Sequence, residues 1–132
     1  MDKFKTVKEY IKDNLTPLWL EGFDSKQFKN SVVVEANAPK TEFAVFMGRN
    51  GAVFPSWYNA VLEKKNEQVN LLVFEDIDRL SEEEQERFLE IVKYRTISNA
   101  KLPDNCCIIL TSSSTGRKIN PKLSRFLTYI KI

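Results

Sequence analysis

The chain has 132 residues, of which 42% are hydrophobic and 29% are charged, a composition that favours one folded domain over residues 1–132 and argues against disorder. It contains no histidine, which excludes Ser-His and Cys-His nucleophile pairs and the commonest zinc ligands. No apolar run approaches the roughly 20 residues of a membrane-spanning helix, and the charged N-terminus has no apolar signal core. We therefore expect a cytoplasmic protein that makes no membrane contact.

The first third of the chain predicts a surface helix and one strand. Residues 3–15 carry apolar side chains at helical spacing with lysines behind them. Pro17 and the residues up to Asn30 interrupt this pattern, and Ser31–Glu35 is typical of a short buried strand because it is rich in β-branched residues. Residues 38–51 alternate like a strand but contain two glycines, so their structure stays open.

The middle of the chain alternates helix and strand signals. We expect a helix from Ser56, with Ser56 as its N-cap and Trp57 and Tyr58 in the core. The apolar run 70–74 then has the profile of a central parallel strand covered on both faces. A capping box at Ser81 and Glu84 predicts the start of a helix that runs to Arg95.

The last third predicts a second buried strand over residues 106–111. Cys106 and Cys107 are neighbours in it, so they should point to opposite faces and remain reduced. Pro121 suits the start of a short helix through Arg125, and residues 127–132 suggest a strand near a sheet edge. Strands alternating with helices predict an α/β three-layer sandwich with a mainly parallel sheet of four or five strands and helices on both faces.

The order of motifs from Leu71 to Ile132 resembles the second half of an AAA+ ATPase core. LLVFEDID resembles the Walker B strand, LPDNCCIILTSSS the sensor 1 strand and INPKLSRF the segment that bears the arginine finger. Some of these segments look most like MoxR-type proteins and others like clamp-loader subunits. The resemblance implies a P-loop NTPase fold, with Glu75 and Asp76 at the Walker B position, Ser112 at sensor 1 and Arg125 as the finger.

The nucleotide chemistry of that family is only partly represented in this sequence. The Walker B pattern ends in Asp then Glu, whereas this chain has Glu75 then Asp76, which displaces each carboxylate by roughly 1.5 Å although Mg²⁺ demands oxygen ligands at about 2.0–2.1 Å. No G-x-x-x-x-G-K-[ST] phosphate loop occurs in the 132 residues. The nearest candidate for a remnant is Lys40-Thr41, and the alternative for that segment is a plain turn. We also expect no counterpart of the family's helical lid after the last predicted strand.

The C-terminal segment has an uneven charge. The formal net charge is +2, yet no acid follows Asn105, and the bases there are Arg117, Lys118, Lys122, Arg125 and Lys131. This end could meet an acidic partner or remain a solvated face. Because an arginine finger acts on the nucleotide of a neighbouring subunit, Arg125 needs no phosphate loop in its own chain, although it could equally pair with an acid or stay solvated.

These observations leave three hypotheses for the function. The first is a non-catalytic module without a cofactor that docks on a protein partner, such as an AAA+ ATPase or a DNA-replication or remodelling assembly, through Arg117, Lys118, Lys122 and Arg125. The second is a weak or partner-completed nucleotidase in which Glu75 and Asp76 hold Mg²⁺ and Lys40 and Thr41 contact the phosphates of ATP. The third is a nucleic-acid-binding domain that uses the basic C-terminal segment.

The position of the strand at Val32–Glu35 in the sheet has two solutions. The first strand of an AAA+ core lies in the middle of its sheet. We expect Val32–Glu35 to be that strand, with residues 41–53 remodelled. The alternative is that it is the second strand of the family, in which case another segment must fill the centre.

Overall fold

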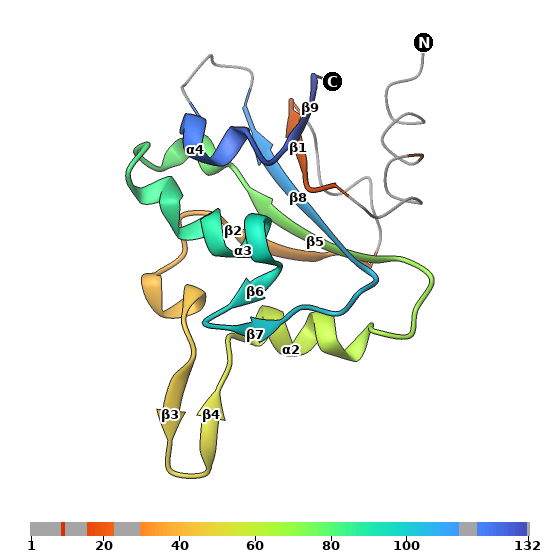
Figure 1. The fold of residues 1–132 in the computed structure, drawn as a ribbon, viewed down its shortest axis with the longest axis vertical. Helices are drawn as coiled ribbons and strands as arrows, with labels where there is room; N and C mark the ends of the chain where they lie inside the picture. Colours follow the sequence, from red (N-terminus) through yellow and green to blue (C-terminus); the bar gives the residue numbers. More distant parts are fainter. Residues whose placement is uncertain (1–8, 10–15, 23–29, 114–118, 132) are drawn as a thin grey trace.

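The computed structural model describes residues 9, 16–22, 30–113 and 119–131. Its main sheet has five strands in the order β2-β5-β8-β1-β9, and every neighbouring pair is parallel. The strands are β1 (Leu18–Glu21), β2 (Val32–Glu35), β5 (Asn70–Glu75), β8 (Cys106–Ser112) and β9 (Thr128–Lys131). Figure 1 shows this sheet with helices against it, and the α/β prediction with a mainly parallel sheet is confirmed.

The strand between β8 and β9 is β1, which the sequence analysis missed. Leu18–Glu21 pairs with β8 on one side and with β9 on the other, so it occupies the interior position that we assigned to Val32–Glu35. That assignment was wrong, because Val32–Glu35 forms β2 at the sheet edge and pairs only with β5 among the described strands. Of its residues only Val34 is buried, as suits an edge strand.

The two faces of the sheet contribute to separate apolar clusters. Alternate residues of β5 and β8 join helix residues in the larger cluster, which contains Phe74, Trp57 and Phe88. The opposite face forms a smaller cluster of strand residues, namely Leu18, Leu20, Leu71, Val73, Cys107 and Ile109. Cys106 and Cys107 fall into different clusters and are free thiols, as the alternation along a strand predicts.

The described helices add their buried side chains to the larger cluster. They are α2 (Ser56–Glu63), α3 (Leu89–Tyr94) and α4 (Pro121–Ser124). The 3-10 helices are η2 (Lys40–Phe43) after β2, η3 (Ile77–Arg79) after β5 and η4 (Glu84–Phe88), which runs into α3. None of the helices in the described ranges is long and apolar enough to cross a membrane. The helix predicted over residues 3–15 falls almost wholly outside the described residues, and helices on the second face of the sheet stay a prediction.

The predicted helix between Ser81 and Arg95 is divided into two parts. The capping box is confirmed, since the Glu84 N–H donates to the Ser81 hydroxyl at 3.1 Å and the Glu84 carboxylate accepts from the Ser81 N–H at 3.2 Å. A 3-10 turn follows and becomes α-helical only at Leu89. Helix α2 also starts one residue earlier than predicted, with Pro55 rather than Ser56 as its N-cap.

Two β-hairpins stand outside the main sheet (Figure 1). The hairpin of β3 (Phe46–Gly48) and β4 (Gly51–Val53) accounts for the ambiguous segment, and its turn uses Gly51 at φ +111°. The second hairpin joins β6 (Thr96–Ile97) to β7 (Ala100–Lys101) through Ser98 and Asn99, which both have positive φ as a tight two-residue turn requires.

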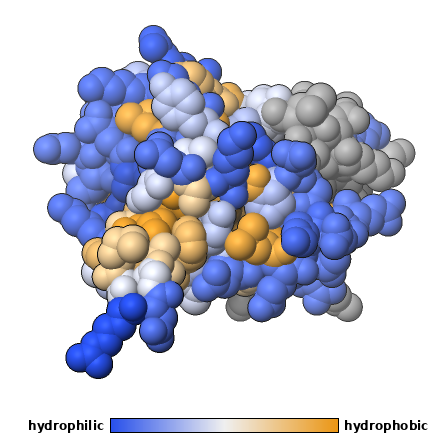
Figure 2. Space-filling model, turned by 60° about the horizontal axis from the view of Figure 1, so that its bottom comes forward, coloured by the Kyte–Doolittle hydropathy of each residue, from blue (hydrophilic) through white to orange (hydrophobic). Residues whose placement is uncertain are grey.

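The β3–β4 hairpin presents apolar side chains to solvent. Phe46, Met47 and Val53 are all exposed, Met47 by 82%. Figure 2 turns this end of the molecule toward the reader and shows hydrophobic surface gathered there. The predicted remodelling of residues 41–53 thus takes the form of η2 followed by a projecting hairpin.

Candidate functional site

The ends of β5 and β8 bring three of the predicted nucleotide residues, Glu75, Asp76 and Ser112, to one edge of the sheet. In a parallel α/β sheet, ligands bind outside the carboxyl ends of the strands. Glu75 closes β5, Ser112 closes β8 and Glu21 closes β1, and Glu21 is paired in register with Ser112. We call this region the carboxyl edge.

The Walker B-like pair is held by hydrogen bonds and ion pairs within the chain. Asp76 has left-handed backbone angles (φ 60°, ψ 52°), and its N–H donates to the Thr111 hydroxyl at 3.0 Å. Its carboxylate lies 3.4 Å from the Arg79 guanidinium, which also lies 3.7 Å from Glu35. The backbone carbonyl of Glu75 accepts the Ala36 N–H at 2.9 Å. The carboxylate of Asp76 therefore already has a cationic partner.

Asp78 is a further acid at the carboxyl edge that our sequence analysis did not single out. It is only 6% exposed, and its carboxylate accepts the Ser113 hydroxyl at 2.5 Å and the Ser113 N–H at 3.3 Å. These bonds tie the turn after β5 to the residue that follows β8. The signal in the sequence is the third acid of the run Glu75-Asp76-Ile77-Asp78, and burial gives it a structural role.

The sensor 1-like Ser112 is buried and bonded to a tryptophan. Its side chain accepts the indole N–H of Trp19 at 2.8 Å, and the residue is 5% exposed. Trp19 lies in β1, and its ring packs against Tyr129 of β9 with the centroids 4.4 Å apart. The large side chain of the interior strand thus lies over the hydroxyl that a phosphate sensor would present.

A tyrosine links the last strand to the same edge. The Tyr129 hydroxyl donates to the Glu21 carboxylate at 2.5 Å, and this hydrogen bond is the main reason that the pKa of Tyr129 is raised. Trp19, Ser112, Tyr129 and Glu21 therefore form a connected group across β8, β1 and β9.

The interior position of β1 also locates the segment that would carry a phosphate loop. The residues after β1 are Gly22-Phe23-Asp24-Ser25-Lys26-Gln27-Phe28-Lys29. Only the first glycine of the G-x-x-x-x-G-K-[ST] pattern is present, and Gln27 and Phe28 stand where the second glycine and the lysine would be. Residues 23–29 lie outside the described part of the structure, so this departure is read from the sequence.

The structure resembles solved structures over nearly the whole chain. A candidate ATPase from Cytophaga hutchinsonii superposes with a TM-score of 0.57 at 11% identity, covering 98% of this chain and 46% of its own. NtrX from Brucella abortus in complex with ADP gives a TM-score of 0.56 at 13% identity, covering 98% of this chain and 34% of its own. No protein-family model and no curated protein matches the sequence.

The fold is AAA+-like. The chain spans less than half of the length of these structures. At this identity the likeness establishes the fold alone, and the chemistry must be argued from the residues present.

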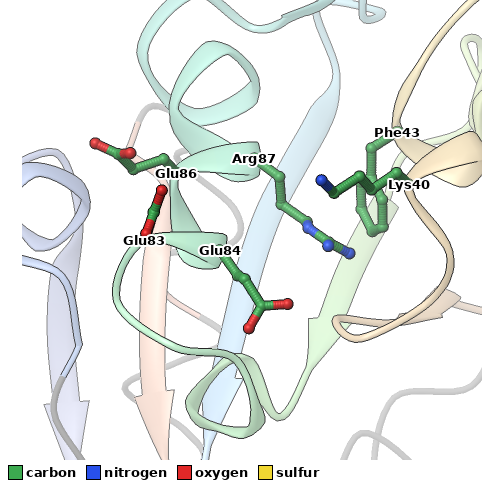
Figure 3. Close-up of a pocket in the computed structure, with 6 residues that line it drawn as sticks. All are labelled: Lys40, Phe43, Glu83, Glu84, Glu86 and Arg87. Carbon is green, nitrogen blue, oxygen red and sulfur yellow. The ribbon is translucent and has the colours of Figure 1, made fainter.

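Lys40 and Thr41 lie beyond the edge strand β2 and not beyond the interior strand β1. They begin η2, and Lys40 lines a pocket of about 430 Å³ with Phe43, Arg87 and the acids Glu83, Glu84 and Glu86. Figure 3 shows Arg87 extending toward Phe43 and Lys40. Its guanidinium lies 4.9 Å from the Phe43 ring centroid. Such a mixture of acids and bases does not suit a polyphosphate.

The basic residues of the C-terminal segment are partly placed by the structure. Arg117 and Lys118 lie outside the described residues. Lys122 forms an exposed ion pair with Glu86 at 3.1 Å, and Arg125 is exposed just after α4. Both line a groove with residues of α3, and neither Glu75 nor Asp76 lines it. The role of Arg125 as an arginine finger stays a prediction.

No cluster of three or more metal-ligating side chains is found within the described residues. Glu75 and Asp76 would have to hold Mg²⁺ as a pair completed by water or phosphate oxygens.

Proposed function

We propose that this chain is a non-catalytic AAA+-like module that docks on a protein partner, with an ATPase or a DNA-replication or remodelling assembly as the expected class. The observation that carries the proposal is the hydrogen bond from Trp19 to Ser112. It engages the sensor-like hydroxyl in the interior of the protein, beneath a ring packed on Tyr129.

The acids of the carboxyl edge support the same conclusion. Asp76 is paired with Arg79, and Asp78 is buried on Ser113. A nucleotide would have to replace these internal partners with phosphate and Mg²⁺ contacts. The segment after β1 has neither the second glycine nor the lysine of the phosphate-loop pattern at the required positions. A phosphate loop works through closely spaced backbone N–H groups and one lysine, so the contacts that would offset this cost are missing from the pattern.

The first experiment is a calorimetric titration of the chain with ATP and Mg²⁺, followed in parallel by tryptophan fluorescence. Trp19 lies at the carboxyl edge, so a nucleotide bound there would change its emission, and Trp19→Phe identifies that part of the signal. We expect no saturable heat and no fluorescence change at millimolar nucleotide. Saturable binding that is lost in Asp76→Asn or Lys40→Ala would refute the proposal and establish a remodelled nucleotide site.

The docking half of the proposal needs a separate experiment. Wild type and Arg125→Ala are compared side by side as baits for interacting proteins. We expect an ATPase or an assembly that contains one to be retained by wild type and reduced with Arg125→Ala. Retention of that protein at equal levels by both baits would count against docking through the C-terminal segment.

A further inference from the structure

A groove between α3 and the end of α4 combines apolar and basic side chains. Its volume is about 350 Å³. Leu89, Tyr94 and Phe126 supply apolar surface, while Lys93, Lys122 and Arg125 supply positive charge. Tyr94 is 64% exposed, and Leu89 and Phe126 are half-buried. We call this feature the α3–α4 groove, and Figure 1 shows the two helices from which it is named.

The acid in the groove forms no ion pair with the bases of the groove among the described residues. Glu90 also lines the groove, but its carboxylate accepts hydrogen bonds from the Thr96 hydroxyl at 2.6 Å, the Asn99 N–H at 2.8 Å and the Ser98 N–H at 3.0 Å. Glu90 is therefore committed to the β6–β7 hairpin. With three bases and one acid in its lining, the groove keeps a net positive charge.

The remaining internal partner of these bases is weak. Lys122 is paired with Glu86, but the lysine side chain is 72% exposed, and exposed ion pairs typically contribute about 0–1 kcal/mol. Arg125 has no ion pair within the described residues. Both side chains can therefore exchange their present surroundings for an incoming carboxylate at little cost.

The aromatic faces favour a peptide over a nucleic acid. The Lys93 ammonium lies 5.0 Å from the Tyr94 ring centroid and 5.6 Å from that of Phe126. Both rings therefore contact the same cation and form one apolar side of the groove. Single-stranded nucleic acid is bound along an extended basic track with successive stacking platforms, whereas this groove is one compact site of about 350 Å³. The volume is at the lower end of the range for ligand pockets and suits one or two side chains.

We propose that the α3–α4 groove binds a short acidic segment of a protein partner, with one aromatic or branched aliphatic side chain seated against Leu89, Tyr94 and Phe126. Carboxylates on either side of that side chain pair with Lys122 and Arg125. Charge complementarity steers the encounter, and the apolar side chain supplies the buried contact. The inference rests on the proposed docking function and adds the chemistry of the partner.

The test is a fluorescence-polarisation titration of the chain with a labelled peptide of sequence Glu-Asp-Glu-Phe-Leu-Asp-Glu. We expect saturable binding that weakens as salt is raised, because the charges are exposed. Arg125→Glu should weaken it by roughly tenfold, since reversal removes one exposed pair and adds a repulsion. Lys65→Glu makes the same change of charge at an exposed lysine outside the groove and should leave the affinity nearly unchanged.

Two further arms separate this mode of binding from attraction by charge alone. Tyr94→Ala leaves the charge unchanged and should weaken the peptide, and replacing Phe-Leu in the peptide by Ser-Ser should do the same. Equal weakening by Lys65→Glu and Arg125→Glu, indifference to Tyr94→Ala, or tighter binding of a single-stranded oligonucleotide than of the peptide would each overturn the inference. The ATP titration decides the proposed lack of nucleotide chemistry independently, so the two failures are distinguishable.

Discussion

The hydrogen bond between Trp19 and Ser112 makes a quantitative prediction about the carboxyl edge. Ser112→Ala leaves the indole N–H of Trp19 without its acceptor in a partly buried place, at an expected cost of about 1–3 kcal/mol in unfolding free energy. Trp19→Phe removes the donor while keeping a ring against Tyr129, and we expect a loss of similar size. The double variant should be less destabilised than the sum of the two, by about 1 kcal/mol, because the bond can be lost only once.

The assay is urea denaturation followed by far-ultraviolet circular dichroism, which does not depend on tryptophan emission. A matched control combines Ser112→Ala with Trp57→Phe, whose indole donates to the carbonyl of Glu42 instead, and those two changes should be additive. A coupling below roughly 0.3 kcal/mol between Trp19 and Ser112 would refute the reasoning. It would mean that the Ser112 hydroxyl is available to a ligand, and the proposed loss of nucleotide chemistry would lose its main support.

Three further predictions concern stability and reactivity. Burial alone would raise the pKa of Glu90, but its hydrogen bonds to the β6–β7 hairpin lower that pKa in the folded state. Glu90 therefore stabilises the folded state above its unfolded-state pKa, and this contribution is lost as the pH falls through its folded-state pKa. The stability of Glu90→Gln should be less sensitive to acid in that range, and an unchanged pH dependence would contradict the assignment. Asn105→Ala removes side-chain bonds to the carbonyls of Lys64 and Glu67 and should cost about 1–3 kcal/mol in chemical denaturation, against Asn66→Ala as an exposed control. Burial raises the pKa of Cys106 to about 12 and that of Cys107 to about 11, so neither thiol should be alkylated in the native protein at mildly alkaline pH; rapid labelling without denaturant, read by mass spectrometry, would show that the sheet opens.

The strands β5 and β8 were predictable because each depends on local sequence alone. A continuous apolar run such as Leu71–Phe74 is expected wherever both faces of a parallel strand are covered. The capping box at Ser81 is similarly local, since its two partners are three residues apart. The acids at the end of β5 and the hydroxyl at the end of β8 lie at one edge because these two strands are parallel neighbours.

The strand β1 could not be assigned in the same way. Leu18–Glu21 has only four residues, follows a proline and precedes a glycine. Its local sequence is therefore typical of a loop between two elements and not of a strand. It becomes a strand because β8 and β9 flank it, and both lie far away in the sequence. The Ser98-Asn99 turn was missed for a related reason, since it has positive φ without any glycine. Trp19 and Asp78 were missed as site residues because their partners are set by tertiary pairing.

The interior place of β1 has a consequence for synthesis on the ribosome. Its contacts join residues 93 and 108 positions apart, as the Trp19–Ser112 and Tyr129–Glu21 bonds show. The neighbours of β1 are β8 and β9, which are synthesised near the end of the described chain. β2, β5 and the helix between them therefore emerge from the ribosome before β1 has a strand to pair with. Since long-range parallel pairing is slow and leaves apolar edges exposed, nascent chains should depend on chaperones most strongly just before β8 and β9 appear.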